Sequence, residues 1–185
     1  MIFRYLMKFP TKESLSRYAI EYFLENETAP LVKKNDVNNK LWKKASCFVT
    51  VYVAGKLRGC IGDIIAKEPL YKNIIKNAIN AAFSDIRFSP IDKEELPLLT
   101  IEVSVLSKPK DYKPKNTADL IKYLEEKKPG LILEKYGRKA LFLPQVWEEI
   151  KKPSEFLSHL CLKAGLNPFS WQDEGMRYWV FNVSK

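Results

Sequence analysis

The sequence predicts an α+β protein with a largely antiparallel sheet. Three observations support this fold class. Segments of alternating apolar and polar residues, typical of half-buried strands, are interspersed with segments of helical three-four spacing. The two kinds of segment follow no regular strand-helix-strand rhythm, which argues against a parallel α/β sheet. The composition, 46% hydrophobic and 29% charged residues, is that of a globular protein.

The length of the chain limits the number of domains, and its cysteines indicate the redox state of its thiols. Its 185 residues suffice for one substantial core, or for a main lobe with a small appendage. We therefore predict a single domain over 1–185. The apolar runs stay well short of the roughly 20 residues that cross a bilayer. The three cysteines are widely spaced, which predicts reduced thiols in the cytoplasm rather than disulfides or a zinc site.

The first half of the chain predicts two helices and two strands. Thr11 can cap a helix with one apolar stripe, and the Asn- and Pro-containing residues 29–44 indicate a loop. CFVTVYV at 47–53 alternates as a strand does, and AGK turns it into a second strand at 57–65. A helix over 69–83 follows, with proline at its first position.

The second half predicts a further mixture of strands and helices. LTIEVSVLS at 99–107 alternates clearly and is a strand. The remaining expectations, in chain order, are an exposed Pro-Lys link at 108–115, a helix at 118–127 capped by Thr117, a hairpin at 130–144 turning at Tyr136 and Gly137, a short helix at 145–150, a helix at 153–164 stopped by Gly165, and a final strand at 178–184.

The stretch LRGCIG at residues 57–62 combines a guanidinium, a thiol and two glycines in one strand. Extended backbone alternates its side chains, so we expect Leu57 and Ile61 in the core and Arg58 and Cys60 together on the other face. A nearby guanidinium lowers the pKa of a thiol, and the thiolate is the reactive form. The alternative is a buried, inert Cys60 beside a surface Arg58.

The two glycines of this stretch have two readings. A missing side chain at Gly59 or Gly62 lets a ligand or a second backbone come close. It can equally mark a bulge in the strand.

Two further stretches hold candidate site residues. Asp85, Arg87 and Phe88 form a D-x-R-F turn, in which the carboxylate either pairs with the arginine or belongs to a site. Glu102 is a carboxylate in mid-strand, where acidic residues are depleted. It either faces water or is held by a cation such as Arg58 or Arg87, as an ion pair or as a site member.

The distribution of charge and the single histidine bear on three further possibilities: nucleic-acid binding, a zinc site and a catalytic Cys-His pair. The net charge of +9 is compatible with nucleic-acid binding, but the lysines are dispersed among loop residues, which favours a solvated basic surface. With His159 as the only histidine, a zinc site has little to build from. A catalytic Cys-His pair would require His159 to reach Cys60 across the fold.

Several ordered motifs resemble the AMMECR family. They are LRGCIG, EPLYKNIIKNAINAAFSDIRFSPI, ELPLLTIEVSVLS, GLILEKYGRKALFLPQV and EFLSHLCLKAGL. The resemblance, closest to the archaeal AmmeMemoRadiSam system protein A type, implies an α+β fold with a larger lobe, built on an antiparallel sheet flanked by helices, and a smaller lobe, which would come from parts of 108–152. It also implies that the hexapeptide and the D-x-R-F turn lie near a cleft. It also implies an association with Memo-type and radical SAM proteins, without an established activity. Relatives often have a small hydroxyl residue where this chain has Asp63.

These observations leave three functions open. In the first, the protein is an enzyme or enzyme subunit of a modification pathway, with Cys60 as nucleophile or acceptor thiol and Asp85 or Glu102 moving protons. The second is a non-catalytic module that binds a small molecule, an anionic ligand or a protein partner at the same face. The third is a nucleic-acid binder. The expected ligand-binding residues are Arg58, Gly59, Gly62, Arg87 and Phe88. We predict no metal site, no cofactor and no membrane association.

Overall fold

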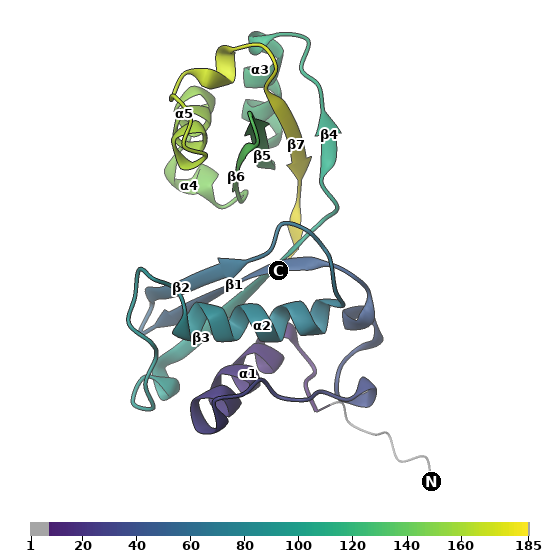
Figure 1. Ribbon diagram of the computed structural model, residues 1–185, viewed down its shortest axis with the longest axis vertical. Coiled ribbons are helices and arrows are strands. Elements are labelled where there is room, and N and C mark those ends of the chain that lie inside the picture. Colours follow the sequence, from purple (N-terminus) through teal and green to yellow (C-terminus); the bar gives the residue numbers. More distant parts are fainter. Residues whose placement is uncertain (1–7, 185) are drawn as a thin grey trace. The chain divides into compact units, whose positions relative to one another are not determined.

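The computed structural model describes residues 8–184, with the side chain of Lys34 left out (Figure 1). The chain divides into two compact units. The first contains residues 8–106 together with Ser184, and the second contains Ser107–Val183. The second unit thus extends through the C-terminal part of the chain, well beyond the expected 108–152.

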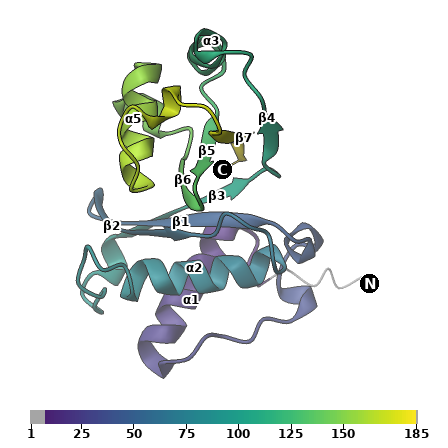
Figure 2. The same cartoon turned by 45° about the horizontal axis from the view of Figure 1, so that its top comes forward.

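The first unit is a four-stranded sheet with two helices on one face. Its strand order is β2-β1-β3-β8, and β1 pairs antiparallel with both β2 and β3. Helix α2 packs on β1 and β2, while α1 packs on α2 and β3. Figure 2 shows both helices on the same side of this sheet. The elements are α1 (Lys12–Asn26), β1 (Ser46–Val53), β2 (Lys56–Gly62), α2 (Leu70–Phe83), β3 (Leu99–Leu106) and β8 (Val183–Ser184).

Local sequence explains these elements. Thr11 and Ser14 form a capping box at the start of α1, with Thr11 Oγ1 accepting from the Ser14 amide at 3.0 Å. Helix α2 follows Pro69, as expected, and its apolar stripe is buried: Leu70, Ile74, Ala78 and Ala81. The expected loop at 29–44 contains two short 3-10 helices, η1 (Lys34–Asp36) and η2 (Asn39–Trp42), and a third, η3 (Leu96–Leu98), precedes β3.

The second unit has its own antiparallel sheet, in the order β4-β7-β5-β6, and its own core around Phe156 and Leu133. The expected Pro-Lys link is only partly a link, because β4 forms there and pairs with β7. The elements are β4 (Lys110–Tyr112), α3 (Thr117–Lys127), β5 (Gly130–Lys135), β6 (Arg138–Phe142), α4 (Val146–Glu149), α5 (Pro153–Lys163), η4 (Ser170–Gln172) and β7 (Arg177–Phe181).

Turn and cap positions in this unit follow the sequence with one exception. Tyr136 and Gly137 both have positive φ, 54° and 74°, as the turn of a tight hairpin requires. Gly165 ends α5 with φ 71°. The cap of α3 is Asn116 and not Thr117, because the Asn116 side chain accepts from the Asp119 amide.

The helices and two antiparallel sheets confirm the α+β fold class. Among the residues that the structure describes, no helix combines the length and the apolar character needed to cross a membrane.

Candidate functional site

Strand β2 is an edge strand of the first sheet, and a bulge interrupts its alternation. Cys60 lies opposite Thr50 of β1 and Leu57 lies opposite Tyr52, which leaves Arg58 as the extra residue. Residues directly opposite one another share a face, so Leu57 points to the same side as Cys60. The expectation that Leu57 enters the core is therefore wrong, and its exposed fraction is 39%.

A sulfur, a hydroxyl and a carboxylate lie in one row across three strands. The Thr50 hydroxyl donates a hydrogen bond to Cys60 Sγ at 3.4 Å, and Glu102 of β3 lies opposite Thr50 on its other side. The neighbouring Val49 and Val51 of β1 are buried on the helix-covered face, so this row belongs to the face without the helices α1 and α2.

Cys60 is also the accessible thiol among the three cysteines. Cys60 is half-buried, whereas Cys47 and Cys161 are fully buried. Burial raises the pKa of the Cys47 thiol to about 12 and raises that of Cys161 as well. The two buried thiols are thus kept neutral and out of contact with solvent, as structural cysteines are.

The glycines of the hexapeptide allow close packing within the protein. A Cβ at Gly59 would lie 1.8 Å from the carbonyl oxygen of Ala81 in α2, so a second backbone approaches there. A Cβ at Gly62 would lie 2.3 Å from the ring of Phe48. The space beside each glycine is therefore filled by the chain itself, and neither position opens a hollow for a ligand.

The D-x-R-F turn binds the free edge of β2 at Cys60. The Cys60 amide donates to Asp85 Oδ2 at 2.9 Å, and Arg87 Nη2 donates to the Cys60 carbonyl at 3.4 Å. Arg87 also donates to both carboxylate oxygens of Asp85, at 2.9 and 2.6 Å. The hydrogen bonds from Arg87 hold the pKa of Asp85 well below its usual range. Asp85 is consequently an ionised acceptor that fixes the Cys60 backbone, a state poorly suited to proton transfer near pH 7.

The second arginine of the site is held by a carboxylate as well. Arg58 Nε and Nη2 donate to the two oxygens of Glu95, both at 2.8 Å, and Nη1 donates to the Ser89 carbonyl. These bonds raise the pKa of Arg58 and lower that of Glu95. Phe88 lies beneath Arg87, whose guanidinium carbon is 5.3 Å from the ring centre. The sequence reasoning missed Glu95, which carries no signal of its own beyond an acidic loop.

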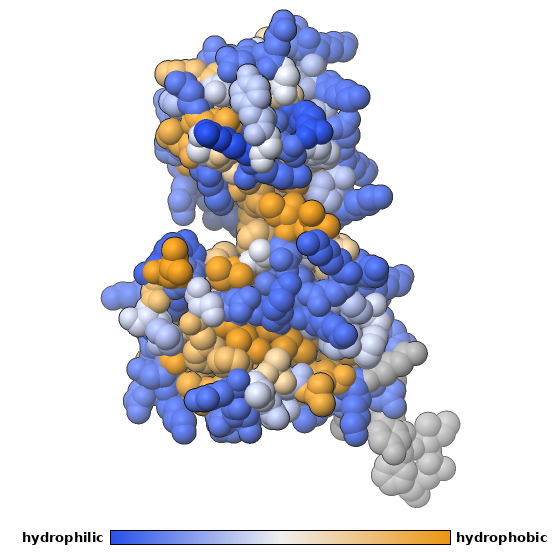
Figure 3. All heavy atoms as spheres, viewed as in Figure 1, coloured by the Kyte–Doolittle hydropathy of each residue, from blue (hydrophilic) through white to orange (hydrophobic). Residues whose placement is uncertain are grey.

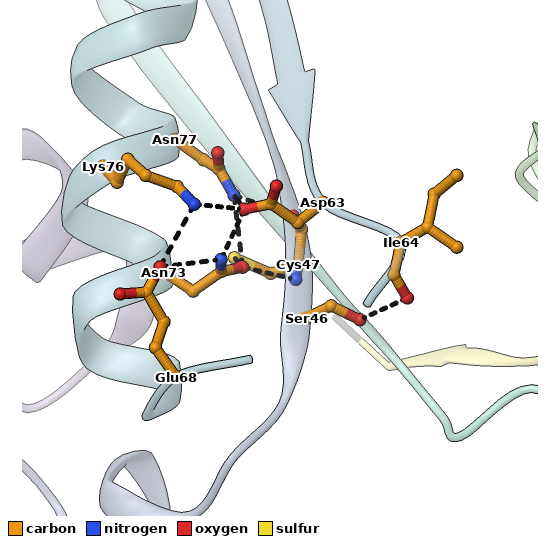
Figure 4. Close-up of polar contacts among 8 residues, drawn as sticks. All are labelled: Ser46, Cys47, Asp63, Ile64, Glu68, Asn73, Lys76 and Asn77. Atoms are coloured by element: carbon orange, nitrogen blue, oxygen red, sulfur yellow. Dashed lines mark hydrogen bonds and ion pairs between the residues drawn. The ribbon is translucent and has the colours of Figure 1, made fainter. Parts of the chain in front are cut away.

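A polar cluster that sequence reasoning also missed joins α2 to the sheet near the end of β2 (Figure 4). Asn73 and Asn77 are buried in the apolar stripe of α2. Asn73 Oδ1 accepts from the amide of Cys47 at 2.9 Å and from its thiol at 3.3 Å, and Asn77 donates to the Cys47 carbonyl at 3.1 Å. The signal available in the sequence was a pair of asparagines four residues apart within that stripe.

Asp63, the residue after the hexapeptide, completes this cluster. Its Oδ2 accepts from Asn73 Nδ2 at 2.6 Å and lies 2.6 Å from Lys76 Nζ, which also pairs with Glu68 at 3.1 Å (Figure 4). Burial alone would raise the pKa of Asp63, but the hydrogen bonds from Lys76 and Asn73 outweigh it and lower that pKa. The charge of Asp63 is thereby compensated within α2.

The histidine and the metal chemistry considered from the sequence do not join this site. His159 is an exposed residue of α5 in the second unit, whereas Cys60 belongs to the first. Between residues 8 and 184, no group of three or more His, Cys, Asp or Glu side chains is arranged to hold a metal ion.

The fold and the site define a class of protein: an α+β protein of two antiparallel sheets, with an accessible thiol fixed on the edge strand of one of them. The chain belongs to the AMMECR1 family, whose model matches residues 14–185.

The relatives and a solved structure agree with this assignment. The chain is 38% identical to Protein MK0488 of Methanopyrus kandleri, over 91% of this chain and 83% of that protein. It is 42% identical to Protein LS215_2104 of Saccharolobus islandicus, over 76% of this chain and 64% of that longer protein. The crystal structure of the uncharacterized protein PH0010 from Pyrococcus horikoshii matches with a TM-score of 0.81 and 36% identity, over 93% of this chain and 87% of that one.

Proposed function

We propose that the face of β1, β2 and β3 that carries Cys60 is a ligand-binding site, and that the Cys60 thiol is the group in contact with the ligand. The observation that carries this proposal is the fixation of an accessible thiol. The Cys60 amide and carbonyl are held by Asp85 and Arg87, and its sulfur accepts a hydrogen bond from Thr50. A preorganised side chain loses little conformational entropy when a ligand binds.

The electrostatics favour a ligand other than a simple anion. Arg58 is engaged by Glu95 and Arg87 by Asp85, so an anion would have to displace a carboxylate from either guanidinium. The row of thiol, hydroxyl and carboxylate offers hydrogen bonds to a polar small molecule or to a protein segment. A binding module is therefore the function that the geometry supports best.

A second function, an enzyme or enzyme subunit of a modification pathway, is favoured by the Thr50–Cys60 contact in the same row as Glu102. In that version Cys60 is the nucleophile or acceptor thiol and Glu102 moves the proton. Family membership supports the choice of Memo-type and radical SAM proteins as candidate partners, as in the AmmeMemoRadiSam association. A cytoplasmic location, in keeping with three free cysteines, belongs to the same proposal.

The experiment that tests the site is thiol labelling followed by partner titration. Iodoacetamide at pH 7.5 should modify Cys60 in the folded protein well before Cys47 or Cys161, as read by peptide mass spectrometry. Equal modification of all three cysteines would contradict the proposal.

Titration calorimetry with purified Memo-type and radical SAM proteins then tests for a partner, and Cys60→Ser should retain binding in either case. Covalent change of the bound partner, read by mass spectrometry, separates the two functions: it should appear with the parent and not with Cys60→Ser if the protein is an enzyme, and with neither if it is a binding module. Lys56→Ala, an exposed position on the same strand, is the matched control. If neither partner binds at micromolar concentrations, the proposed pathway is wrong even where the labelling result stands.

Nucleic-acid binding through the dispersed lysines stays a prediction with its own test. Binding through phosphate contacts weakens steeply as the salt concentration rises. A salt titration with labelled RNA and DNA should show that slope, and affinity that is flat with salt would remove this function.

A further inference from the structure

The first unit has an apolar groove on the far side of α2 from the sheet. The groove encloses about 510 Å³ between α2 and the segment 29–32. Its apolar lining comes from Phe23, Leu31, Val32, Tyr71, Ile75 and Ile79. Figure 3 shows apolar surface on this side of the first unit, below α2 in the view of Figure 1 and bordered by hydrophilic side chains. The volume lies within the range of small-molecule sites, about 300–1,000 Å³.

One wall of the groove is regular and the other is strongly exposed. Tyr71, Ile75 and Ile79 are spaced four residues apart along α2, so they form a continuous apolar strip about 12 Å long at 1.5 Å per residue. Leu31 faces this strip with an exposed fraction of 96%. Tyr71, Ile75 and Ile79 are themselves only 6–8% exposed, so they form a packed floor, and Leu31 supplies most of the apolar protein surface that a ligand would remove from water.

The rim of the groove carries a cation without a compensating anion. Lys72 and Lys76 both line it. Lys76 is engaged by Asp63 and Glu68 at 2.6 and 3.1 Å. Lys72 is exposed and has no ion-pair partner among residues 8–184. A ligand with one negative charge at its end would complement Lys72 while its apolar part lies along the strip.

The chemistry of the groove walls favours a hydrocarbon ligand over an extended peptide. The main-chain groups of α2 are bonded within the helix, so this wall offers no partners to the amides of an extended peptide. An extended peptide would lose hydrogen bonds to water without replacement, which is costly. A hydrocarbon chain has no such groups to satisfy.

We propose that this groove binds a single-chain alkyl carboxylate of the fatty-acid type, with its chain along Tyr71, Ile75 and Ile79 and its carboxylate at Lys72. The site is separate from the Cys60 face, because α2 lies between the groove and the sheet. The proposal therefore stands or falls independently of the function proposed for Cys60.

The test is titration calorimetry of the full chain with decanoate, dodecanoate and tetradecanoate below their micelle concentrations. Burial of each added methylene should tighten binding roughly fourfold. Dodecylamine, with the opposite charge, should bind at least about tenfold more weakly than dodecanoate. The proposal would be overturned if no saturable binding is seen, or if the affinity does not change with the length of the alkyl chain. So would tighter binding of dodecyl phosphate than of dodecanoate, because the head group would then be a phosphate.

Two exposed positions locate the site without endangering the fold. Leu31→Glu places a charge on the wall and should weaken dodecanoate binding about tenfold or more. Lys72→Glu should weaken dodecanoate and strengthen dodecylamine. Lys122→Ala, an exposed lysine of α3 in the second unit, should change neither. Unchanged affinities in both groove variants, or binding of an amphipathic helical peptide in place of the alkyl chains, would refute the assignment.

Discussion

Replacing Gly59 by alanine tests the close packing on which the geometry of Cys60 depends. The added Cβ would lie 1.8 Å from the carbonyl oxygen of Ala81 and 2.8 Å from its carbonyl carbon. Ordinary contacts of a Cβ begin near 3.4 Å, so the variant is about 1.6 Å short of the space that it needs. The obstacle is helix backbone, which cannot rotate away as a side chain can.

The loss of stability can be estimated from the elements that must move apart. Opening this gap separates α2 from β1 and β2 along the buried residues Ala78 and Val51. Overpacking of a close-packed core costs about 1–3 kcal/mol and occasionally more, and a clash with backbone belongs at the upper end. We expect Gly59→Ala to lower the free energy of unfolding of the first unit by about 3 kcal/mol. Gly55→Ala is the control: its Cβ meets nothing within 4 Å, and its φ of +77° costs only about 1–2 kcal/mol.

Trapping of the buried thiols measures each unit separately. Cys47 has no exposed surface and reports on opening of the first unit, while Cys161 reports on the second. Each loss of about 1.4 kcal/mol in the free energy of unfolding raises the population of the open state tenfold. Gly59→Ala should therefore raise the trapping rate of Cys47 on the order of a hundredfold, with a far smaller effect at Cys161. A rise of less than tenfold at Cys47, or less than in Gly55→Ala, would refute the packing argument.

Three other predictions concern the site and its support. Because Arg87 lowers the folded-state pKa of Asp85, this carboxylate stabilises the protein above the unfolded value of about 3.9, and that stability is lost as the pH falls below it. Urea unfolding should accordingly show Asp85→Asn to be less stable than the parent at pH 7, with a difference that shrinks towards pH 3; a difference constant with pH would contradict this. Asn77→Leu removes the side-chain hydrogen bond to the Cys47 carbonyl, which still accepts from the Asp63 amide at 3.2 Å, and should cost about 0.5–1.5 kcal/mol in the same assay, whereas a neutral effect would make the cluster dispensable. A thiol titration with Ellman's reagent should count one fast thiol in the parent and none in Cys60→Ser.

Local signals predicted much of the fold. Helix α2 follows from an apolar stripe beginning after a proline, and the hairpin turn from a Tyr-Gly pair that can take positive φ. Both depend on residues close in sequence, which is why they are readable there. Strand β4 was missed because its three residues lie among lysines and prolines and become a strand only by pairing with β7.

The site was harder to predict because its contacts join distant segments. The sequence pointed to Cys60 and to the D-x-R-F turn, and it left a bulge at the glycines open, but it did not indicate that Arg58 is the residue at which the alternation breaks. Glu95 lies 37 positions from Arg58. No local pattern indicates that it would take up this guanidinium.

The edge position of β2 also explains why Asp85 and Arg87 stand where they do. An edge strand presents unpaired amides and carbonyls to which another chain could add. At Cys60 both groups are already occupied, the amide by a carboxylate and the carbonyl by a guanidinium. Addition of a further strand beside Cys60 would require breaking an ion pair whose carboxylate is almost fully buried. At the site that we propose, a partner would thus contact the face of the sheet and not its edge beside Cys60, because the sulfur, the Thr50 hydroxyl and the Glu102 carboxylate lie in one row on that face.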